Sequence, residues 1–392
     1  MQVTFFDTEE SWCRMLPISY TRPVAEVRIG ILKISEKWSK ALDNQSYSFY
    51  SQHYLTPLFK RPELKSLFIK GSLLPDDNLI NMMKELSHNE VLVFNEELIA
   101  GFFEPDEPIR TDGRKTIEVA EVTEVKYPWN IFRLNGLEIK SDFETLTSGR
   151  TSQKLQDTHT RTYGKDIFIE EGAQIKAATL NAENGPIYIG KGAELREGSL
   201  IRGPFAVCEH SVVNMGAKIR GDTTIGPYSK VGGEVSNSII QGYSNKGHDG
   251  FLGNSVLGEW CNLGADTNNS NLKNNYTNVK MWNFETGGFK DTGLQFCGLI
   301  MGDHSKCGIN TMFNTGTTVG ISANIFGAGF QKTNIPSFAW GGAPRFTTYL
   351  AKKAFEAADL VMERKKKKLT EADKSVLSHI FEMTSKHRTW EK

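Results

Sequence analysis

Residues 187–231 read IYIGKGAELREGSLIRGPFAVCEHSVVNMGAKIRGDTTIGPYSKV and carry a six-residue rhythm. Every sixth position holds a branched aliphatic residue, and the residue four places further on is mostly small. The aliphatic positions are Ile189, Leu195, Ile201, Val207, Val213, Ile219, Ile225 and Val231. If about a fifth of all positions hold Ile, Leu or Val, such a run arises by chance roughly once in several hundred thousand trials. The rhythm is therefore a structural signal.

A period of six fits neither an α-helix nor a long strand of alternating residues. It fits a short strand followed by a tight turn, in which an aliphatic side chain points into a core and glycine adopts dihedrals that other residues avoid. Three such strands make one coil of about 18 residues, and coils stacked about 4.8 Å apart pair along their whole length. The rhythm predicts a three-sided parallel β-helix.

The distribution of glycine predicts three parts of the chain. Of the 36 glycines, 6 precede residue 151, 30 lie in residues 151–342, and none follows. We therefore expect an α/β domain over residues 1–155, the β-helix over residues 160–342 and a helical segment over residues 343–392.

Local patterns support the two flanking parts. Residues 32–42 and 77–87 have helical composition, and residues 67–74 and 91–94 look like short strands. Near the end of the chain, Thr370 and Asp373 have the spacing of a helix-capping pair. The run Lys365–Lys368 is interpreted as a solvated helix face, with binding of acidic phosphates as the alternative.

Charge and cysteine usage narrow the class of protein. Acidic and basic residues balance at 46 each, which argues against nucleic acid or an anionic membrane as a partner. The chain has 5 cysteines without a C-x-x-C pair, and we expect Cys208, Cys261 and Cys307 to be small core residues. No apolar run approaches the roughly 20 residues of a membrane helix, and the first residues do not resemble a signal peptide. We expect a cytoplasmic protein.

The rhythm breaks between Val231 and Phe251 and again between Leu263 and Met301, and each break predicts a segment that leaves the coil as a loop. The first break contains His248, in YSNKGHDGFLG (243–253). This histidine is either a turn residue bonded to backbone or a general base. The histidines of the coil region lack metal-ligand spacing, so the sequence does not identify a metal site.

The repeat resembles the left-handed β-helix of bacterial acyltransferases. The stretch SNKGHDGFLGNSVLGEWCNLGADT (244–267) is similar to the catalytic segment of the family of bifunctional N-acetylglucosamine-1-phosphate uridylyltransferase and glucosamine-1-phosphate acetyltransferase. This resemblance implies acetyl-CoA and an amino sugar phosphate as substrates, and a homotrimer with active sites between neighbouring subunits. It implies that His248 is the base that accepts a proton from the sugar amine.

The same resemblance assigns the remaining candidate residues of the β-helix. Arg202, Lys246 and Asn271 match positions that contact the sugar phosphate or lie near the acetyl group. The positions along acetyl-CoA are Ala265, Gly302, Asp303 and Ala323. The chain departs from the family pattern at Phe251, which replaces a tyrosine, at Asp266, which replaces a glycine, and near Glu234, where a lysine is missing.

The N-terminal stretch CRMLPISYTRPVAEV (13–27) resembles the start of sugar nucleotidyltransferases. This resemblance implies that Arg14 and Arg22 contact a nucleotide such as UTP or dTTP, together with Mg²⁺. Salt bridging by both arginines is the alternative. Glu9, Glu10 and Trp12 stand where the family has phosphate-binding glycines, and carboxylates beside a triphosphate are unfavourable without a metal ion.

These observations favour acyl transfer from coenzyme A to an amino sugar phosphate, linked to sugar-1-phosphate nucleotidyl transfer, in nucleotide-sugar biosynthesis. Two alternatives stay open at this stage. One is a nucleotidyltransferase whose β-helix only drives assembly. The other is a non-catalytic scaffold that binds nucleotide sugars.

Overall fold

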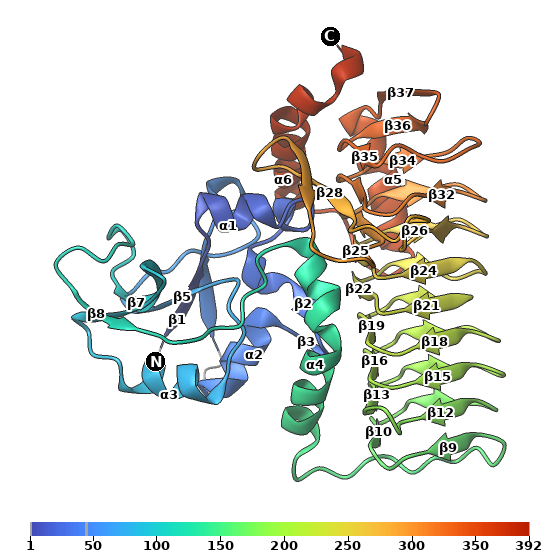
Figure 1. Ribbon diagram of the computed structural model, residues 1–392, viewed down its shortest axis with the longest axis horizontal. Coiled ribbons are helices and arrows are strands. Elements are labelled where there is room, and N and C mark those ends of the chain that lie inside the picture. Colours follow the sequence, from blue (N-terminus) through green and yellow to red (C-terminus); the bar gives the residue numbers. More distant parts are fainter. Residues whose placement is uncertain (1, 44–45, 392) are drawn as a thin grey trace.

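The computed structural model describes residues 2–43 and 46–391. A mixed six-stranded sheet with helices forms the N-terminal part, and it stands beside a tall stack of β-coils that ends in helices (Figure 1). The order of strands in the sheet is β4 (Tyr47–Tyr50), β1 (Val3–Phe6), β5 (Ser66–Lys70), β7 (Glu97–Phe103), β6 (Glu90–Phe94) and β8 (Lys115–Glu118). The helices of this part are α1 (Glu9–Arg14), α2 (Ile34–Ala41), α3 (Asp77–Glu85) and α4 (Pro128–Thr147), with a short hairpin of β2 (Arg28–Ile29) and β3 (Leu32–Lys33).

The coils form the predicted left-handed parallel β-helix of about ten turns. We call its three faces the covered face, the second face and the third face, in the order in which the chain visits them. The covered face consists of β10 (Ile167–Ile169), β13 (Ile187–Ile189), β16 (Phe205–Val207), β19 (Thr223–Ile225), β22 (Ile239–Gly242), β25 (Val256–Glu259), β30 (Leu299–Met301), β33 (Thr317–Val319) and β35 (Asn334–Ile335).

The second face consists of β11 (Gln174–Ile175), β14 (Glu194–Leu195), β17 (Val212–Val213), β20 (Lys230–Val231), β23 (Asn245–Lys246), β26 (Asn262–Leu263), β31 (Lys306–Cys307), β34 (Asn324–Ile325), β36 (Ala339–Gly342) and the antiparallel β37 (Arg345–Thr348). The third face consists of β9 (Arg161–Tyr163), β12 (Thr179–Asn181), β15 (Leu200–Arg202), β18 (Lys218–Arg220), β21 (Glu234–Ser236) and β24 (Phe251–Gly253), followed by β27 (Asn268–Asn269) and β32 (Met312–Phe313).

The aliphatic rhythm builds the interior of the coils. The eight aliphatic residues of the rhythm, the first being Ile189 and the last Val231, are at most 2% exposed. They stack in register, as in the ladder Ile189, Val207 and Ile225. Cys208, Cys261 and Cys307 are buried free thiols, as predicted. Burial raises the pKa of Cys208 and Cys261 to about 12, so both stay protonated near neutral pH.

The first break in the rhythm is not a loop, which corrects the prediction. Val231 pairs with Lys246, so this coil is only 15 residues long and shortens its corners instead of releasing a segment. The chain then resumes with Leu252 inside the coil, one position later than Phe251. The shortened coil moves the phase of the rhythm by three residues, and this change of phase is what the six-residue count does not detect.

The second break does release a segment, as predicted. Between β27 and β30 the chain leaves the coil and forms a hairpin of β28 (Lys280–Asn283) and β29 (Gly288–Asp291). Asn269, 4% exposed, takes an interior position at the exit, where its amide bonds both the N–H and the carbonyl of Gly253. Each of the two irregular coils therefore contains a large polar interior residue, Lys246 in the shortened coil and Asn269 at the exit of the second break.

The covered face is buried under the N-terminal part. Helix α4 lies along the coils (Figure 1), and the outward-facing Ile239, Val256 and Ile300 join the same apolar cluster as Trp129 of α4. The side chain of Gln241 also bonds the backbone N–H and carbonyl of Arg28, at 2.6 and 3.0 Å. The sheet and the coils therefore share one core.

The C-terminal residues form α5 (Ala351–Glu363) and α6 (Glu371–Met383). Thr370 caps α6 as predicted, because its side chain accepts a hydrogen bond from the N–H of Asp373. The run Lys365–Lys368 lies in the connection between the two helices, so its interpretation as a helix face is wrong. In the described part of the chain, no helix has both the length and the apolar composition needed to cross a membrane.

Candidate active site

His248 lies at the corner where the chain passes from the second face to the third, between β23 and β24. Its side chain is exposed. The strands before this corner stack from coil to coil, so the second residue after each strand belongs to a vertical row, which we call the corner row: Met215, Gly233, His248, Ala265 and Ile309. The rigid coils therefore present one imidazole to solvent within an otherwise apolar row.

Glycines precede four members of the corner row: Gly232, Gly247, Gly264 and Gly308. A Cβ atom on Gly264 would lie 2.5 Å from the carbonyl carbon of Gly308, which no real side chain achieves. Glycine is therefore required at this position by the close approach of the next coil. His248 itself has no side-chain hydrogen bond among the residues that the structure describes, so its ring is free to contact a ligand.

Lys246 does not face a ligand, which corrects its prediction as a sugar-phosphate contact. Its side chain points into the coil and is 1% exposed. The ammonium donates hydrogen bonds to the carbonyls of Gly232 (3.2 Å), Asp249 (3.0 Å) and His248. Burial lowers the pKa of Lys246 to about 8. Its contacts hold the backbone of the His248 corner in place.

Two asparagines that the sequence analysis did not single out support this corner. The amide of Asn214 donates to the carbonyl of Gly247 at 2.7 Å, and the side-chain oxygen of Asn268 accepts from the N–H of Phe251 at 2.8 Å. The first contact skips one coil, at a sequence separation of 33 residues, and the second joins adjacent coils, at a separation of 17 residues. No local motif marks such pairs, although both residues follow the coil periodicity.

Arg202 lies on the third face at the end of β15, three coils before β24, so the structure does not bring it to His248 within one chain. Directly in register with it stands Arg220, one coil closer to His248. Arg202 is exposed, and Arg220 is exposed apart from an ion pair of 3.2 Å with Glu234. The repeated tripeptide Ile-Arg-Gly, at residues 201–203 and 219–221, is the sequence signal that points to this pair.

Asn271 lies one coil beyond β24, at the far end of the third face. Its amide donates to the side-chain oxygen of Asn254 at 2.8 Å. This bond connects the segment that leaves the coils, residues 270–298, which we call the excursion, to the coil that carries His248. The residue is half-buried. Asn271 is therefore near the candidate site but is already engaged in a contact between coils.

Of the four residues predicted to contact acetyl-CoA, only Ala265 lies in the corner row. Gly302 and Asp303 lie at the opposite corner, between the covered and second faces, and Ala323 is an interior residue of the coil, 1% exposed. A pantetheine chain beside His248 would therefore not reach these three residues. The resemblance, and not the rhythm, assigned these three residues, and within one chain the structure does not bring them to the corner row.

Asp303 and Arg22 contact each other, although one was predicted to bind acetyl-CoA and the other a nucleotide. The carboxylate of Asp303 pairs with the guanidinium of Arg22 and accepts a hydrogen bond from Thr21 at 2.7 Å. Both side chains are nearly fully buried, at 3% and 5% exposed. This ion pair joins the N-terminal part to the coils, so the salt-bridge alternative holds for Arg22.

Arg14 is also engaged in the structure. Its guanidinium bonds Glu285 of the excursion at 3.1 and 3.3 Å and lies 5.7 Å from the ring centre of Tyr127. It borders a narrow crevice at the carboxyl ends of β1 and β5, together with Lys70 and Glu124. Arg14 and Arg22 therefore belong to different sites and do not form one nucleotide-binding pair.

The donor set of this crevice does not fit Mg²⁺. Among residues 2–43 and 46–391, no cluster of three or more histidine, cysteine, aspartate or glutamate side chains could hold a metal ion. Glu124 and Glu97 are both paired with Lys70, at 2.7 and 2.6 Å. Asp7, at the end of β1, bonds Ser51 and the N–H of Val24, and burial raises its pKa to about 6. Mg²⁺ requires carboxylates that are free to bind it.

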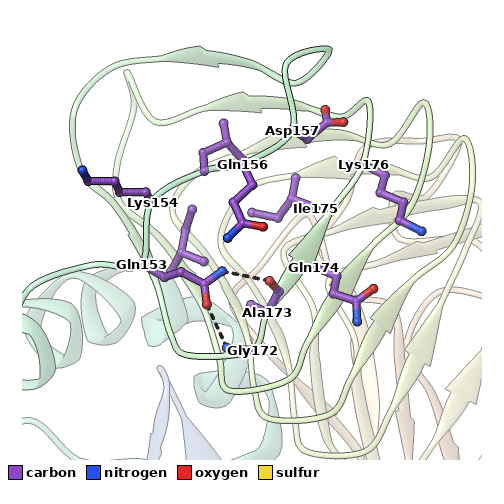
Figure 2. A pocket seen from close by; sticks show the side chains of 11 residues that line it. Gln153, Lys154, Gln156, Asp157, Gly172, Ala173, Gln174, Ile175 and Lys176 are labelled. Carbon is purple, nitrogen blue, oxygen red and sulfur yellow. Dashed lines mark hydrogen bonds between the residues drawn. The ribbon is translucent and has the colours of Figure 1, made fainter.

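A separate cavity of about 550 Å³ lies at the first coil of the β-helix (Figure 2). Residues 153–157 cross the open end, and the side chain of Gln153 bonds the N–H of Gly172 and the carbonyl of Ala173, at 2.8 and 3.1 Å. Leu155 packs against the interior of the coil. This segment closes the first coil, four strands away from the His248 corner along the second face.

Comparisons with known proteins agree with this architecture. Residues 3–151 match the family model of sugar nucleotidyl transferases. A bifunctional sugar-1-phosphate nucleotidylyltransferase/acetyltransferase from Sulfurisphaera tokodaii is 25% identical over 332 residues, which cover 82% of this chain and 71% of the relative.

The bifunctional protein GlmU of Nocardia farcinica is 28% identical over 199 residues, which cover 46% of this chain and 35% of that protein. The chain therefore spans about a third of this relative. The crystal structure of an Arabidopsis UDP-N-acetylglucosamine acyltransferase is 15% identical, covers 53% of this chain and 78% of that one, and has a TM-score of 0.24.

Proposed function

We propose that this chain, a relative of the bifunctional sugar-1-phosphate nucleotidylyltransferase/acetyltransferases, transfers an acyl group from coenzyme A to the amine of an amino sugar phosphate. The observation that carries the proposal is His248, a single exposed imidazole at a glycine-lined corner of a rigid β-helix.

The reaction requires a base beside the attacking nitrogen. The amine attacks the thioester carbon, and the imidazole of His248 accepts the proton that the nitrogen loses as the C–N bond forms. The C–S bond then breaks, and the coenzyme A thiolate takes this proton from the imidazolium of His248 and leaves as the thiol. Backbone N–H groups of the corner are suited to stabilising the oxyanion. The corner row offers Ala265 and the adjacent glycines as a smooth surface for the pantetheine chain.

Arg202 and Arg220 support an anionic substrate. Their guanidinium groups stand on neighbouring coils, which are about 4.8 Å apart, on an exposed face. Guanidinium pairs bind phosphate through charge-assisted hydrogen bonds. Because Arg220 is one coil closer to His248, we assign the phosphate contact primarily to Arg220.

The apolar members of the corner row support a trimer with the active site between subunits. Met215 and Ile309 are each 70% exposed and stand on either side of His248 along the row. Such side chains are costly to leave in water, and three-fold assembly of three-sided coils would cover them. A neighbouring subunit would then complete the site around the free imidazole.

Release of thiol from acetyl-CoA in the presence of glucosamine 1-phosphate tests the proposal. We expect wild-type protein to release thiol, and His248→Ala to lose about 10²- to 10⁴-fold in kcat, the usual contribution of a general base. His210→Ala is the matched control, because His210 is an exposed histidine at another corner of the coils. Equal activity of His248→Ala and wild type would contradict the assignment.

A second activity, sugar-1-phosphate nucleotidyl transfer, is supported by the family match of residues 3–151. The crevice at the carboxyl ends of the parallel strands is where open α/β sheets bind ligands, and it contains Lys70 and Arg14. Release of pyrophosphate from UTP or dTTP with a sugar 1-phosphate tests this activity. No release with either nucleotide would leave the sheet a structural role.

A further inference from the structure

A cavity of about 280 Å³ lies where three parts of the chain meet. Thr21, Arg22, Glu26 and Lys33 come from the N-terminal part, Glu259, Trp260, Asp303 and His304 from the corner between the covered and second faces, and Val376 and Leu377 from α6. Its volume is close to the lower end of the range of about 300–1,000 Å³ that ligand pockets occupy. The cavity therefore suits a molecule of about one ring.

Two residues that line this cavity each carry a buried polar atom that has no partner in the described part of the chain. Among the described residues, neither Nη1 of Arg22 nor Nδ1 of His304 makes a hydrogen bond, and both atoms are buried. Arg22 as a whole is 5% exposed. Nearly all buried polar groups in proteins are bonded, and an orphaned guanidinium N–H is costly. A ligand that offers an acceptor to Arg22 and a hydroxyl to His304 would satisfy both atoms.

The charges around the cavity select against anions. Four carboxylates line it, from Glu26, Glu259, Asp303 and Asp373, against the two cations Arg22 and Lys33. Burial lowers the pKa of His304 to about 3, so its imidazole adds no charge near neutral pH. Glu259 has only a distant contact, at 3.7 Å from Arg22, and is the carboxylate most open to a cationic group.

The remaining wall is apolar and partly aromatic. Trp260 stacks between Tyr243 and His304 in a ladder of rings along the corner, with centroid distances of 4.3 and 6.4 Å. Leu58, Phe59 and Leu377 complete this wall. An aromatic and aliphatic wall that faces a charged wall suits a ring with one C–H face and several hydroxyls.

We propose that this cavity binds an unphosphorylated amino sugar. Its ammonium group pairs with Glu259, its hydroxyls bond Nη1 of Arg22 and Nδ1 of His304, and the C–H face of its ring packs on Leu58 and Phe59. The cavity shares no residue with the His248 corner or with the crevice that contains Lys70, so it is a third site. The inference does not depend on the proposed acyl transfer.

Isothermal titration of the full chain tests the site with D-glucosamine, D-glucose and glucosamine 6-phosphate as probes, without acetyl-CoA. We expect D-glucosamine to bind and D-glucose to bind about tenfold more weakly, because the sugar that lacks the ammonium loses a charge-assisted bond. Glucosamine 6-phosphate should bind more weakly still, because of the excess of carboxylates. Absence of glucosamine binding, or a phosphate ester that binds as well as glucosamine, would overturn the proposal.

Three variants locate the binding. Leu58→Trp places a large side chain in the cavity without touching the ion pairs and should abolish binding, whereas Leu64→Trp, at an exposed leucine that does not line the cavity, should not. Glu259→Gln should weaken glucosamine binding about tenfold. His248→Ala should bind glucosamine as wild type does. Binding that survives Leu58→Trp or is lost in His248→Ala would place the sugar elsewhere and overturn the proposal.

Discussion

Replacing Lys246 by methionine tests how the structure holds the His248 corner. Methionine has a similar length and lacks the ammonium that bonds the carbonyls of Gly232, His248 and Asp249. Each hydrogen bond to a charged donor contributes about 1.5–3 kcal/mol, so the substitution removes about 4–9 kcal/mol of favourable contacts.

The substitution also removes an unfavourable term, the burial of the charge. The pKa of Lys246 falls from 10.5 to about 8, and each pKa unit corresponds to about 1.4 kcal/mol, so removing the charge returns about 3 kcal/mol. The lost hydrogen bonds outweigh this gain. We expect Lys246→Met to lower the free energy of unfolding near pH 7 by about 1–6 kcal/mol.

The pH dependence gives a second measure. The unfolded chain binds the lysine proton up to about pH 10.5 and the folded chain only up to about pH 8, so the unfolded state binds more protons between these values. Stability from this group therefore rises with pH in this window. The advantage of wild type over Lys246→Met should grow by about 3 kcal/mol from pH 8 to pH 10.5.

Urea unfolding of both proteins across this pH range measures the difference. Lys230→Met is the control, because Lys230 stands one coil earlier on the outside of the coil and should change stability by less than about 0.5 kcal/mol. A Lys246→Met protein as stable as wild type at pH 7, with no growth of the difference at higher pH, would refute this reasoning.

Three further predictions concern other parts of the molecule. Burial raises the pKa of Asp7 from 3.8 to about 6, so the stability that this group contributes is lost as pH rises through this window. Relative to Asp7→Asn, wild type should lose up to about 3 kcal/mol of unfolding free energy between about pH 4 and pH 7.5, as measured by thermal or urea unfolding. Ile309→Glu should dissociate the proposed trimer, as measured by analytical ultracentrifugation, whereas an unchanged mass would argue against assembly through the corner row. Arg220→Ala should raise the KM for the sugar phosphate about tenfold or more, and Arg202→Ala should raise it less; the reverse order would move the phosphate site down the third face.

The fold could be predicted from the sequence because a six-residue rhythm is a local signal that repeats. Each aliphatic position from Ile189 to Val231 specifies its own interior contact without reference to distant residues. The rhythm gave the wrong phase only where the coil shortens, so it predicts Phe251 inside the coil instead of Leu252. Lys246, which the resemblance assigned to the sugar phosphate, lies inside the same shortened coil. An interior lysine is tolerated there because three carbonyls satisfy its ammonium.

The candidate site could be predicted only in part. His248 and Ala265 follow the coil periodicity and lie together in one row, as expected from the motif around them. The pairing of Arg22 with Asp303 joins residues that are 281 positions apart, and neither residue carries a local signal for the other. Contacts between the sheet and the coils depend on how the two pack, so the ion pair that buries Asp303 could not be predicted by counting repeats. Ala323 stands four places after Val319, where the rhythm predicts a small residue, and it is 1% exposed.

The central claim is that the imidazole of His248 serves as the base for acyl transfer. Steady-state thiol release from acetyl-CoA with glucosamine 1-phosphate, measured on wild type, His248→Ala and His210→Ala, tests it most directly. The account predicts a fall in kcat of about 10²- to 10⁴-fold for His248→Ala and no significant change for His210→Ala. Folded His248→Ala protein that keeps the wild-type kcat would contradict it.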